Sequence, residues 1–220
     1  MAPPKQQSFI SRALISLGLA KVKASLLVVG LANSGKTSIV NTLKADRTED
    51  VAPTVGFAVE KFSVLKTKLT VMDMSGQQRY QPLWECYYQD VQGVIFVADA
   101  ADKHSLATAS DVLWGLLGNA DLAASPLLIY ANKMDLAHAV PASDIAVLMD
   151  LASITDRPWQ IAPSSAATGE GVESGITWLL EQIRGKAKQR RSSRMAPDSA
   201  GSSFSSMLRA RSARPGSDAG

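Results

Sequence analysis

The sequence predicts an α/β fold with a mostly parallel six-stranded sheet that is flanked by helices on both faces. Three observations lead to this prediction. Between residues 25 and 183, short apolar runs alternate with segments of helical periodicity, as in strand–helix–strand units. The apolar runs are continuous, which is typical of parallel strands buried on both faces. A glycine-rich turn at residues 30–37 joins the first run to a helical segment.

The expected elements follow from these patterns in chain order. The apolar runs predict strands at Leu26–Gly30, Phe57–Leu65, Leu69–Met72, Gly93–Ala98, Leu127–Ala131 and Trp159–Ala162. Helical periodicity predicts helices at Lys36–Lys44, Pro82–Gln89, Ser105–Leu117, Ser143–Leu151 and Val172–Ile183. Ligands of such sheets bind beyond the carboxyl ends of the strands, so we expect the functional residues in the loops that follow them.

Charge divides the 220 residues into three parts. Residues 1–24 carry a net charge of +4, residues 25–183 carry −8, and residues 184–220 carry +7. The central part is expected to be the folded domain. The last part is rich in Ser and Arg and poor in large apolar residues, so it is expected to be disordered. A single cysteine excludes an internal disulfide, and no apolar stretch has the roughly 20 residues of a membrane span, which favours a protein that is cytoplasmic or peripheral on membranes.

The first 24 residues are expected to form an amphipathic helix and a basic linker. The apolar side chains that share one face of this helix are Phe9, Ile10, Ala13, Leu14 and Leu17. Together with Arg12, Lys21 and Lys23, this face favours reversible contact with an anionic membrane. A helix docked permanently on the domain would show the same pattern.

The first chemical motif is G-x-x-x-x-G-K-T, at residues 30–37, between a strand and a helix. Its glycines allow backbone N–H groups to converge on phosphate oxygens at a helix N-terminus. Lys36 is expected to reach the β- and γ-phosphates, and the Thr37 hydroxyl to bind Mg²⁺. The residues expected to bind nucleotide here are Gly30, Leu31, Ala32, Asn33, Ser34, Gly35, Lys36, Thr37 and Ser38. The alternative is a plain glycine turn.

The second motif, Asp73 to Gln77, follows the third expected strand. Asp73 is placed to hold Mg²⁺ through water, the N–H of Gly76 to contact a γ-phosphate, and Gln77 to orient the attacking water. Taken alone, D-x-x-G is a common turn.

The third motif is Asn132-Lys133-Met134-Asp135, after the fifth expected strand. A buried carboxylate at Asp135 would accept hydrogen bonds from the ring N–H and exocyclic amine of guanine, and adenine would leave it unpaired. Asn132 is expected to tie this loop to the phosphate loop, and the Lys133 stem to pack along the base. By itself, N-K-x-D also fits a capped helix start.

Taken together, the three loops resemble the small GTPases. Pro53 to Phe57 resembles the first switch of the Arf branch, Asp73 to Gln77 its second switch, and Ser165-Ala166-Ala167 its guanine-capping loop. The finer pattern, which includes Asn33-Ser34 and Leu83-Trp84-Glu85, is most similar to the Arf-like GTPases linked to Bardet–Biedl syndrome, which recruit the BBSome coat to ciliary membranes. The resemblance covers residues 10–183.

The resemblance implies further roles. Thr54 would join Thr37 on Mg²⁺ when GTP is bound, Gln77 would be the catalytic residue, and Ser165 and the Ala166 N–H would meet the guanine. Phe57, Met72 and Tyr87 would line an effector surface, although each also fits an ordinary core position. The segment Lys66–Lys68 resembles a hairpin whose register shift expels the N-terminal helix on GTP binding.

The implied function is a GTP-binding, slowly hydrolysing switch that recruits a coat or effector in membrane, vesicle or ciliary trafficking. It would work with Mg²⁺, an exchange factor and an activating protein, at membranes that include the cilium base. Two features depart from the pattern: Ala32 replaces a common Asp, and Met1-Ala2 lacks the glycine required for myristoylation. The alternatives are a GTP-binding scaffold with negligible hydrolysis and an adaptor that acts through the basic tail. Nucleic-acid binding is not expected, because Phe204 is the only aromatic residue in the tail.

Overall fold

The computed structural model describes residues 22–44, 54–123 and 125–195. The chain divides into two compact units, of which the first ends at Arg184. The predicted N-terminal helix and the end of the basic tail lie outside the described residues. All three predicted motifs lie within the first unit.

The first unit is built on a six-stranded sheet with the order β2-β3-β1-β4-β5-β6. Strands β1, β3, β4, β5 and β6 run parallel, and only β2 is antiparallel to its neighbour β3. The mostly parallel prediction is therefore confirmed, with β2 as an antiparallel edge. The strands are β1 Val22–Val29, β2 Phe57–Val64, β3 Thr67–Met74, β4 Gly93–Asp99, β5 Leu127–Asn132 and β6 Trp159–Pro163.

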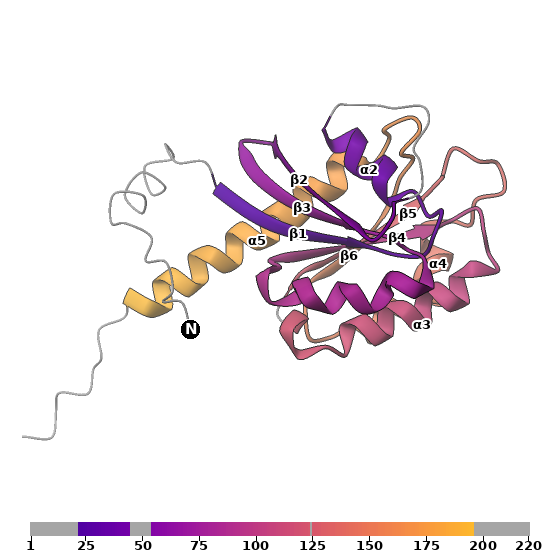
Figure 1. The fold of residues 1–220 in the computed structure, drawn as a ribbon. Coiled ribbons are helices and arrows are strands. Elements are labelled where there is room, and N and C mark those ends of the chain that lie inside the picture. The colour runs from indigo at the N-terminus through magenta and orange to yellow at the C-terminus, as the bar shows by residue number, and fades with distance from the viewer. Residues whose placement is uncertain (1–21, 45–53, 124, 196–220) are drawn as a thin grey trace, which may run out of the picture. The chain divides into compact units, whose positions relative to one another are not determined.

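Helices cover both faces of this sheet, as Figure 1 shows. The helical elements are α2 Lys36–Leu43, η1 Gln78–Asp90, α3 Ser105–Leu117, η2 Ala120–Leu122, α4 Ala142–Leu148, η3 Leu151–Ser153 and α5 Val172–Met195. Helices α2 and α5 pack on the face that holds Leu26, Val28 and Ile95. Elements η1, α3 and α4 pack on the other face, against Leu27, Val29 and Phe96. Alternate residues of a strand thus enter opposite core layers, which accounts for the continuous apolar runs.

Several predicted boundaries differ from the structure, three of them by four residues or more. Strand β1 begins at Val22, so Lys23 and Ala24 belong to the sheet and not to a linker, because β3 extends to Thr67 and pairs with them. The predicted helix Pro82–Gln89 is a 3₁₀ helix over Gln78–Asp90. It contains Pro82, whose missing N–H and fixed φ disfavour a regular α-helix interior.

The third difference concerns the segment after Ile183, where disorder was predicted. Helix α5 instead continues to Met195. The continuation contains Lys186, Ala187 and Gln189, which all have high helix propensity, and no proline interrupts it. Basic residues near a helix C-terminus also complement its dipole.

The hairpin between β2 and β3 turns through two residues in the left-handed region, Leu65 (φ 47°) and Lys66 (φ 63°). Two positive φ values suit a tight two-residue hairpin, although each costs roughly 1–2 kcal/mol for a residue with a side chain. Arg184 of α5 holds this turn: its Nη2 donates to the Leu65 carbonyl oxygen at 3.0 Å and to Thr67 Oγ1 at 2.5 Å.

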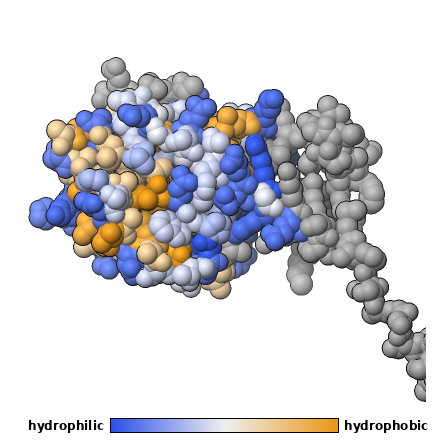
Figure 2. All heavy atoms as spheres, turned by 180° about the vertical axis from the view of Figure 1, so that it is seen from behind, coloured by the Kyte–Doolittle hydropathy of each residue, from blue (hydrophilic) through white to orange (hydrophobic). Residues whose placement is uncertain are grey.

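Exposed large apolar side chains lie in two main places on the first unit: Val55, Phe57 and Val59 on or beside β2, and Val147 and Leu148 at the end of α4. On the face seen in Figure 2, apolar residues gather over part of the surface and are interrupted by hydrophilic ones. None of the described helices is long and apolar enough to cross a bilayer.

Candidate nucleotide-binding site

The phosphate loop and α2 form one wall of a cavity of about 260 Å³ at the carboxyl end of β1. The lining residues are Ala32, Asn33, Gly35, Lys36, Thr37, Ser38, Thr54, Ser75, Gly76 and Gln77. The structure thus gathers the first two predicted motifs and Thr54 around a single space. Gly35 is required here, because its φ is +93° and a Cβ atom would lie 2.2 Å from Asn132 Nδ2.

Lys36 lies at the floor of the loop and is 6% exposed. Its Nζ donates to the Leu31 carbonyl oxygen at 2.6 Å, so the ammonium group curls back inside the loop. Burial lowers the pKa of Lys36 to about 8, and the nearby carboxylate of Asp73 opposes that shift. A buried cation at the N-terminus of helix α2 is suited to bind a polyanion.

Three side chains from different segments form a hydrogen-bonded chain beside Lys36. Thr54 Oγ1 lies 2.9 Å from Thr37 Oγ1, which donates to Asp73 Oδ2 at 2.5 Å. Asp73 is almost fully buried, and its Oδ1 has no hydrogen-bond partner among the described residues. Burial raises the pKa of Asp73, while the hydrogen bond from Thr37 and the charge of Lys36 act in the opposite direction.

Gly76 presses directly on the phosphate loop. A Cβ atom on it would lie 2.3 Å from the carbonyl carbon of Leu31 and 2.4 Å from the N of Ala32. Gln77 lines the cavity, and its Oε1 accepts a hydrogen bond from Arg79 Nε at 3.0 Å. The predicted catalytic glutamine therefore lies at the cavity, with its side-chain oxygen bonded to Arg79 in this structure.

Asn132 joins the third motif to the first, as predicted. Its Nδ2 donates to the Ser34 carbonyl oxygen at 2.8 Å, and its Oδ1 accepts from the Ala166 N–H at 3.0 Å. Three loops that are far apart in sequence are thereby locked together by one buried amide. The Ala166 N–H, expected to contact guanine, is bonded to Asn132 in this structure.

Asp135 differs from its prediction, because it is exposed and not buried. Its Oδ1 accepts a hydrogen bond from Ser165 Oγ at 2.6 Å, so the two residues expected at the guanine edge do lie together. Asp135 lies beyond the end of β5, in a loop where none of the described residues buries its side chain. The predicted selectivity for guanine would therefore require the bound base itself to bury the carboxylate of Asp135.

Asp99 is a functional candidate that the motifs did not identify. It ends β4, and its Oδ2 lies 2.6 Å from Lys133 Nζ. A signal was present in the sequence, because an acid at the carboxyl end of a buried strand belongs to the ligand-binding edge of such a sheet.

The predicted effector residues do not lie on one surface. The rings of Phe57 and Tyr87 are in contact, with centroids 4.9 Å apart. Met72, by contrast, is 4% exposed and belongs to the core, because η1 covers β3. Within the described residues, alternate side chains of the edge strand β2 are exposed, and one of them is Val59, which pairs with Met72 in the β2–β3 register. The exposed apolar surface therefore consists of Phe57 with Val55 and Val59, and does not include Met72. The spacing of two residues between these side chains could have predicted that they share one face of a strand.

The comparisons with known proteins agree with this geometry. The sequence profile of the ADP-ribosylation factor family matches residues 10–183. ADP-ribosylation factor-like protein 6 of Danio rerio is 46% identical over 172 residues, which are 76% of this chain and 92% of the relative. ADP-ribosylation factor-like protein 1 of Saccharomyces cerevisiae is 40% identical over 159 residues, 72% of this chain and 87% of the relative.

A solved structure is similar in the same region. It is the Arl6 BBS3 small GTPase of Trypanosoma brucei with the bound nucleotide analogue GppNp, which aligns with a TM-score of 0.71 and 34% sequence identity. The alignment covers 74% of this chain and 99% of that one.

Proposed function

This chain belongs to the ADP-ribosylation factor family, and from that membership we propose that it is a GTP-dependent switch that recruits a protein coat to a membrane. Members of the family bind guanine nucleotides and hydrolyse GTP, and this chain is an Arf-like GTPase related to Arl6. The observation that carries the switch is the hydrogen-bonded chain of Thr54, Thr37 and Asp73. It joins the segments that enter β2 and leave β3, so a ligand at this point controls the edge of the sheet.

Mg²⁺ fits the residues at this point. The unpartnered Oδ1 of Asp73 and the hydroxyls of Thr37 and Thr54 are oxygen donors, the type that Mg²⁺ prefers. Among the described residues no group of three or more His, Cys, Asp or Glu could hold a metal, so the cation would share phosphate oxygens of the nucleotide. Thr37 and Thr54 would hold it directly and Asp73 through water. When bound, it neutralises charge on the β- and γ-phosphates.

The chain's own residues would then divide the work of hydrolysis. Lys36 balances phosphate charge, the Gly76 N–H meets the γ-phosphate, and Gln77 orients the attacking water. The hydrogen bond from Arg79 to Gln77 supports slow turnover without an activating protein. Intrinsic rates of such sites are on the order of 10⁻⁴ s⁻¹, and an arginine supplied by an activator adds about 10⁵-fold. Gln77→Leu should suppress hydrolysis in a single-turnover assay while GTP binding is retained.

The effector would bind the uncovered edge at β2. Val55, Phe57 and Val59 expose apolar surface beside Tyr87, and this surface directly follows Thr54. Two of the relatives described above carry the name Arl6, and that of Trypanosoma brucei is also named BBS3. We therefore infer a BBSome-like coat as the effector and a ciliary or flagellar membrane as the location. An exchange factor would load the switch with GTP.

Membrane contact would come from the two basic ends of the chain. The amphipathic pattern of residues 9–19 offers apolar side chains, and the basic residues after Arg184 offer attraction to anionic lipid. Because this contact would rest on a short apolar helix face and on attraction to anionic lipid, we expect weak, salt-sensitive binding. Sedimentation with anionic vesicles tests this: removal of residues 1–20 should abolish GTP-dependent binding and leave nucleotide affinity intact. Equal binding of the full chain in both nucleotide states would contradict it.

The coat is tested by capture from a ciliated cell lysate with chain loaded with GDP or with a non-hydrolysable GTP analogue, followed by identification of coat subunits. Val59→Asp should prevent GTP-dependent capture while nucleotide affinity stays unchanged. Val147→Asp makes the same change at a second exposed valine, on α4; it is the matched control and should not affect capture. If coat subunits are absent from the GTP-loaded sample, the coat proposal is wrong although the GTPase assignment stands.

A further inference from the structure

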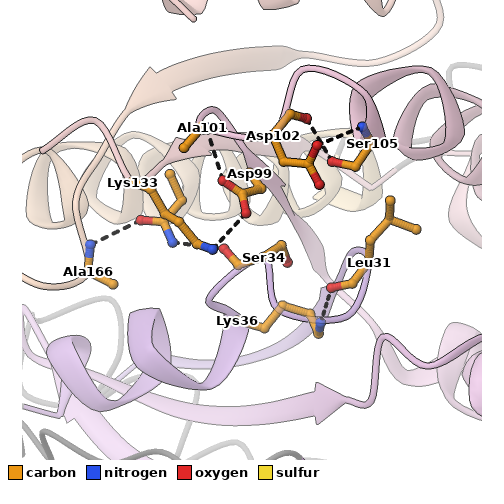
Figure 3. A network of polar contacts seen from close by, with 10 residues as sticks. Leu31, Ser34, Lys36, Asp99, Ala101, Asp102, Ser105, Lys133 and Ala166 are labelled. Carbon is orange, nitrogen blue, oxygen red and sulfur yellow. Dashed lines mark hydrogen bonds and ion pairs between the residues drawn. The ribbon is translucent and has the colours of Figure 1, made fainter. Parts of the chain in front are cut away.

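A second acidic residue, Asp99, lies beside the Asn132–Asp135 loop, which is assigned to guanine. Asp99 ends β4, and the β4–β5 register places it opposite Asn132, the residue before Lys133. Its Oδ1 accepts a hydrogen bond from the Ala101 N–H at 3.0 Å, and its Oδ2 pairs with Lys133 Nζ at 2.6 Å. Figure 3 shows the carboxylate between these two partners. Both carboxylate oxygens are therefore oriented.

The backbone around Lys133 is already fixed without this ion pair. Asn132 is buried and bonded to Ser34 and Ala166, and the Met134 N–H donates to the Ser164 carbonyl oxygen at 3.0 Å. Lys133 itself has a φ of 69°, in the left-handed region. Only the four side-chain torsions of Lys133 remain to be ordered, and the carboxylate of Asp99 fixes the position of the ammonium group at the end of this side chain.

The pair is shielded enough for this contact to matter. The side chain of Lys133 is 25% exposed and that of Asp99 is 13% exposed, so water screens the pair less than it screens an open surface pair. A free lysine loses much rotamer freedom when it is ordered. A side chain that is ordered before its ligand arrives removes that loss from the binding step.

We propose that Asp99 is a positioning residue for the nucleotide, which orders the Lys133 side chain so that its stem already lies where the guanine base packs. The inference rests on the assignment of the Asn132–Asp135 loop to guanine. Its competitor is a purely structural role, in which Asp99 ties β4 to the loop after it and Lys133 is incidental. The two roles differ in whether the effect of Asp99 requires Lys133.

A double-mutant cycle separates them, with release of fluorescently labelled GDP as the measurement. Asp99→Asn keeps an acceptor for the Ala101 N–H and removes the charge. We expect it to speed GDP release about twofold to tenfold, the effect of one long side chain that must be ordered on binding. In a Lys133→Ala background, the same Asp99→Asn change should alter the rate by less than about 1.5-fold.

Asp102→Asn is the matched control, because Asp102 lies three residues away and accepts a hydrogen bond from the N–H of Ser105, the first residue of α3, a role that asparagine also fills. It should leave GDP release unchanged. If Asp99→Asn has the same effect with and without Lys133, or has none in the natural background, the positioning role is refuted. GDP binding to the wild-type protein is measured first, by calorimetry. If GDP does not bind, the guanine site itself is refuted. If GDP binds but the effects of the Asp99 and Lys133 substitutions on GDP release are additive, only the role of Asp99 is refuted.

Discussion

The buried ammonium of Lys36 makes nucleotide affinity depend on pH in a range where most GTPase assays are run. In the free protein its pKa is about 8, because burial disfavours the charge. Phosphate groups beside it must raise that pKa, since they favour the ammonium form. Binding therefore takes up a proton whenever Lys36 is neutral in the free protein, and GDP affinity must fall as the pH rises through 8.

The size of the effect follows from the titration of one group. With a pKa of about 8, Lys36 is about 90% protonated at pH 7 and about a quarter protonated at pH 8.5. GDP affinity should fall about fourfold across this interval, or about 0.8 kcal/mol. The unfolding free energy of the nucleotide-free protein should move the other way: between pH 8 and 10.5 the unfolded chain binds more protons than the folded one, so stability rises with pH.

The assay is the ratio of the association and release rates of labelled GDP at pH 7.0, 7.5, 8.0 and 8.5, at constant ionic strength. The upper limit stays below the pH at which guanine itself ionises. Lys36→Arg supplies the control, because a guanidinium does not titrate in this range, and its affinity should be flat with pH even if it is weaker overall. A flat profile for the natural chain, or an equal slope in Lys36→Arg, would refute the reasoning.

Three further predictions concern the same site. Asp73→Asn removes a carboxylate whose pKa is raised by burial, so at neutral pH the free energy of unfolding of the nucleotide-free protein should rise by about 1 kcal/mol, and its melting temperature by a few degrees, while Mg²⁺-dependent GDP affinity falls. Calorimetry with and without Mg²⁺ measures both effects, and a lower melting temperature would contradict the prediction. Gly35→Ala forces a Cβ atom to within 2.2 Å of Asn132 Nδ2 at a φ of +93°, so GDP release should speed up at least about tenfold, or about 1.4 kcal/mol; an unchanged rate would show that the loop adapts. Asp135→Asn should shift preference from guanine to xanthine nucleotides in a competition assay, and unchanged preference would exclude Asp135 from base recognition.

Local sequence determined most of the site, because a phosphate loop is a contiguous turn whose function depends on backbone geometry. Lys36, Thr37 and Gly76 lie where the motifs place them, around one cavity. Asn132 was expected to join two loops, and its side chain does so through Ser34. Such roles can be predicted because each follows from a residue type at a fixed distance from a strand end.

The errors concern residues whose surroundings come from distant parts of the chain. Met72 is buried because η1 covers β3, and Asp135 is exposed because no segment among residues 22–44, 54–123 and 125–195 packs over its side chain. The partner of Asp99 depends on the β4–β5 register, which periodicity alone does not give. Helix α5 extends beyond the apolar pattern, which ends at Ile183, because the following residues have high helix propensity although they are not buried in the core.

The contact of Arg184 with the β2–β3 turn constrains how the basic tail can be studied. The apolar pattern ends at Ile183, which makes the next peptide bond the natural place to shorten the chain. A cut there would also delete the guanidinium that holds the carbonyl of Leu65 and the hydroxyl of Thr67. Loss of membrane binding in such a truncation would then mix two causes, the missing tail charge and a loosened hairpin. Truncation after Gly185 removes the tail and keeps the hydrogen bonds from Arg184 to the hairpin, whereas Arg184→Ala in the full chain removes these hydrogen bonds and keeps the tail.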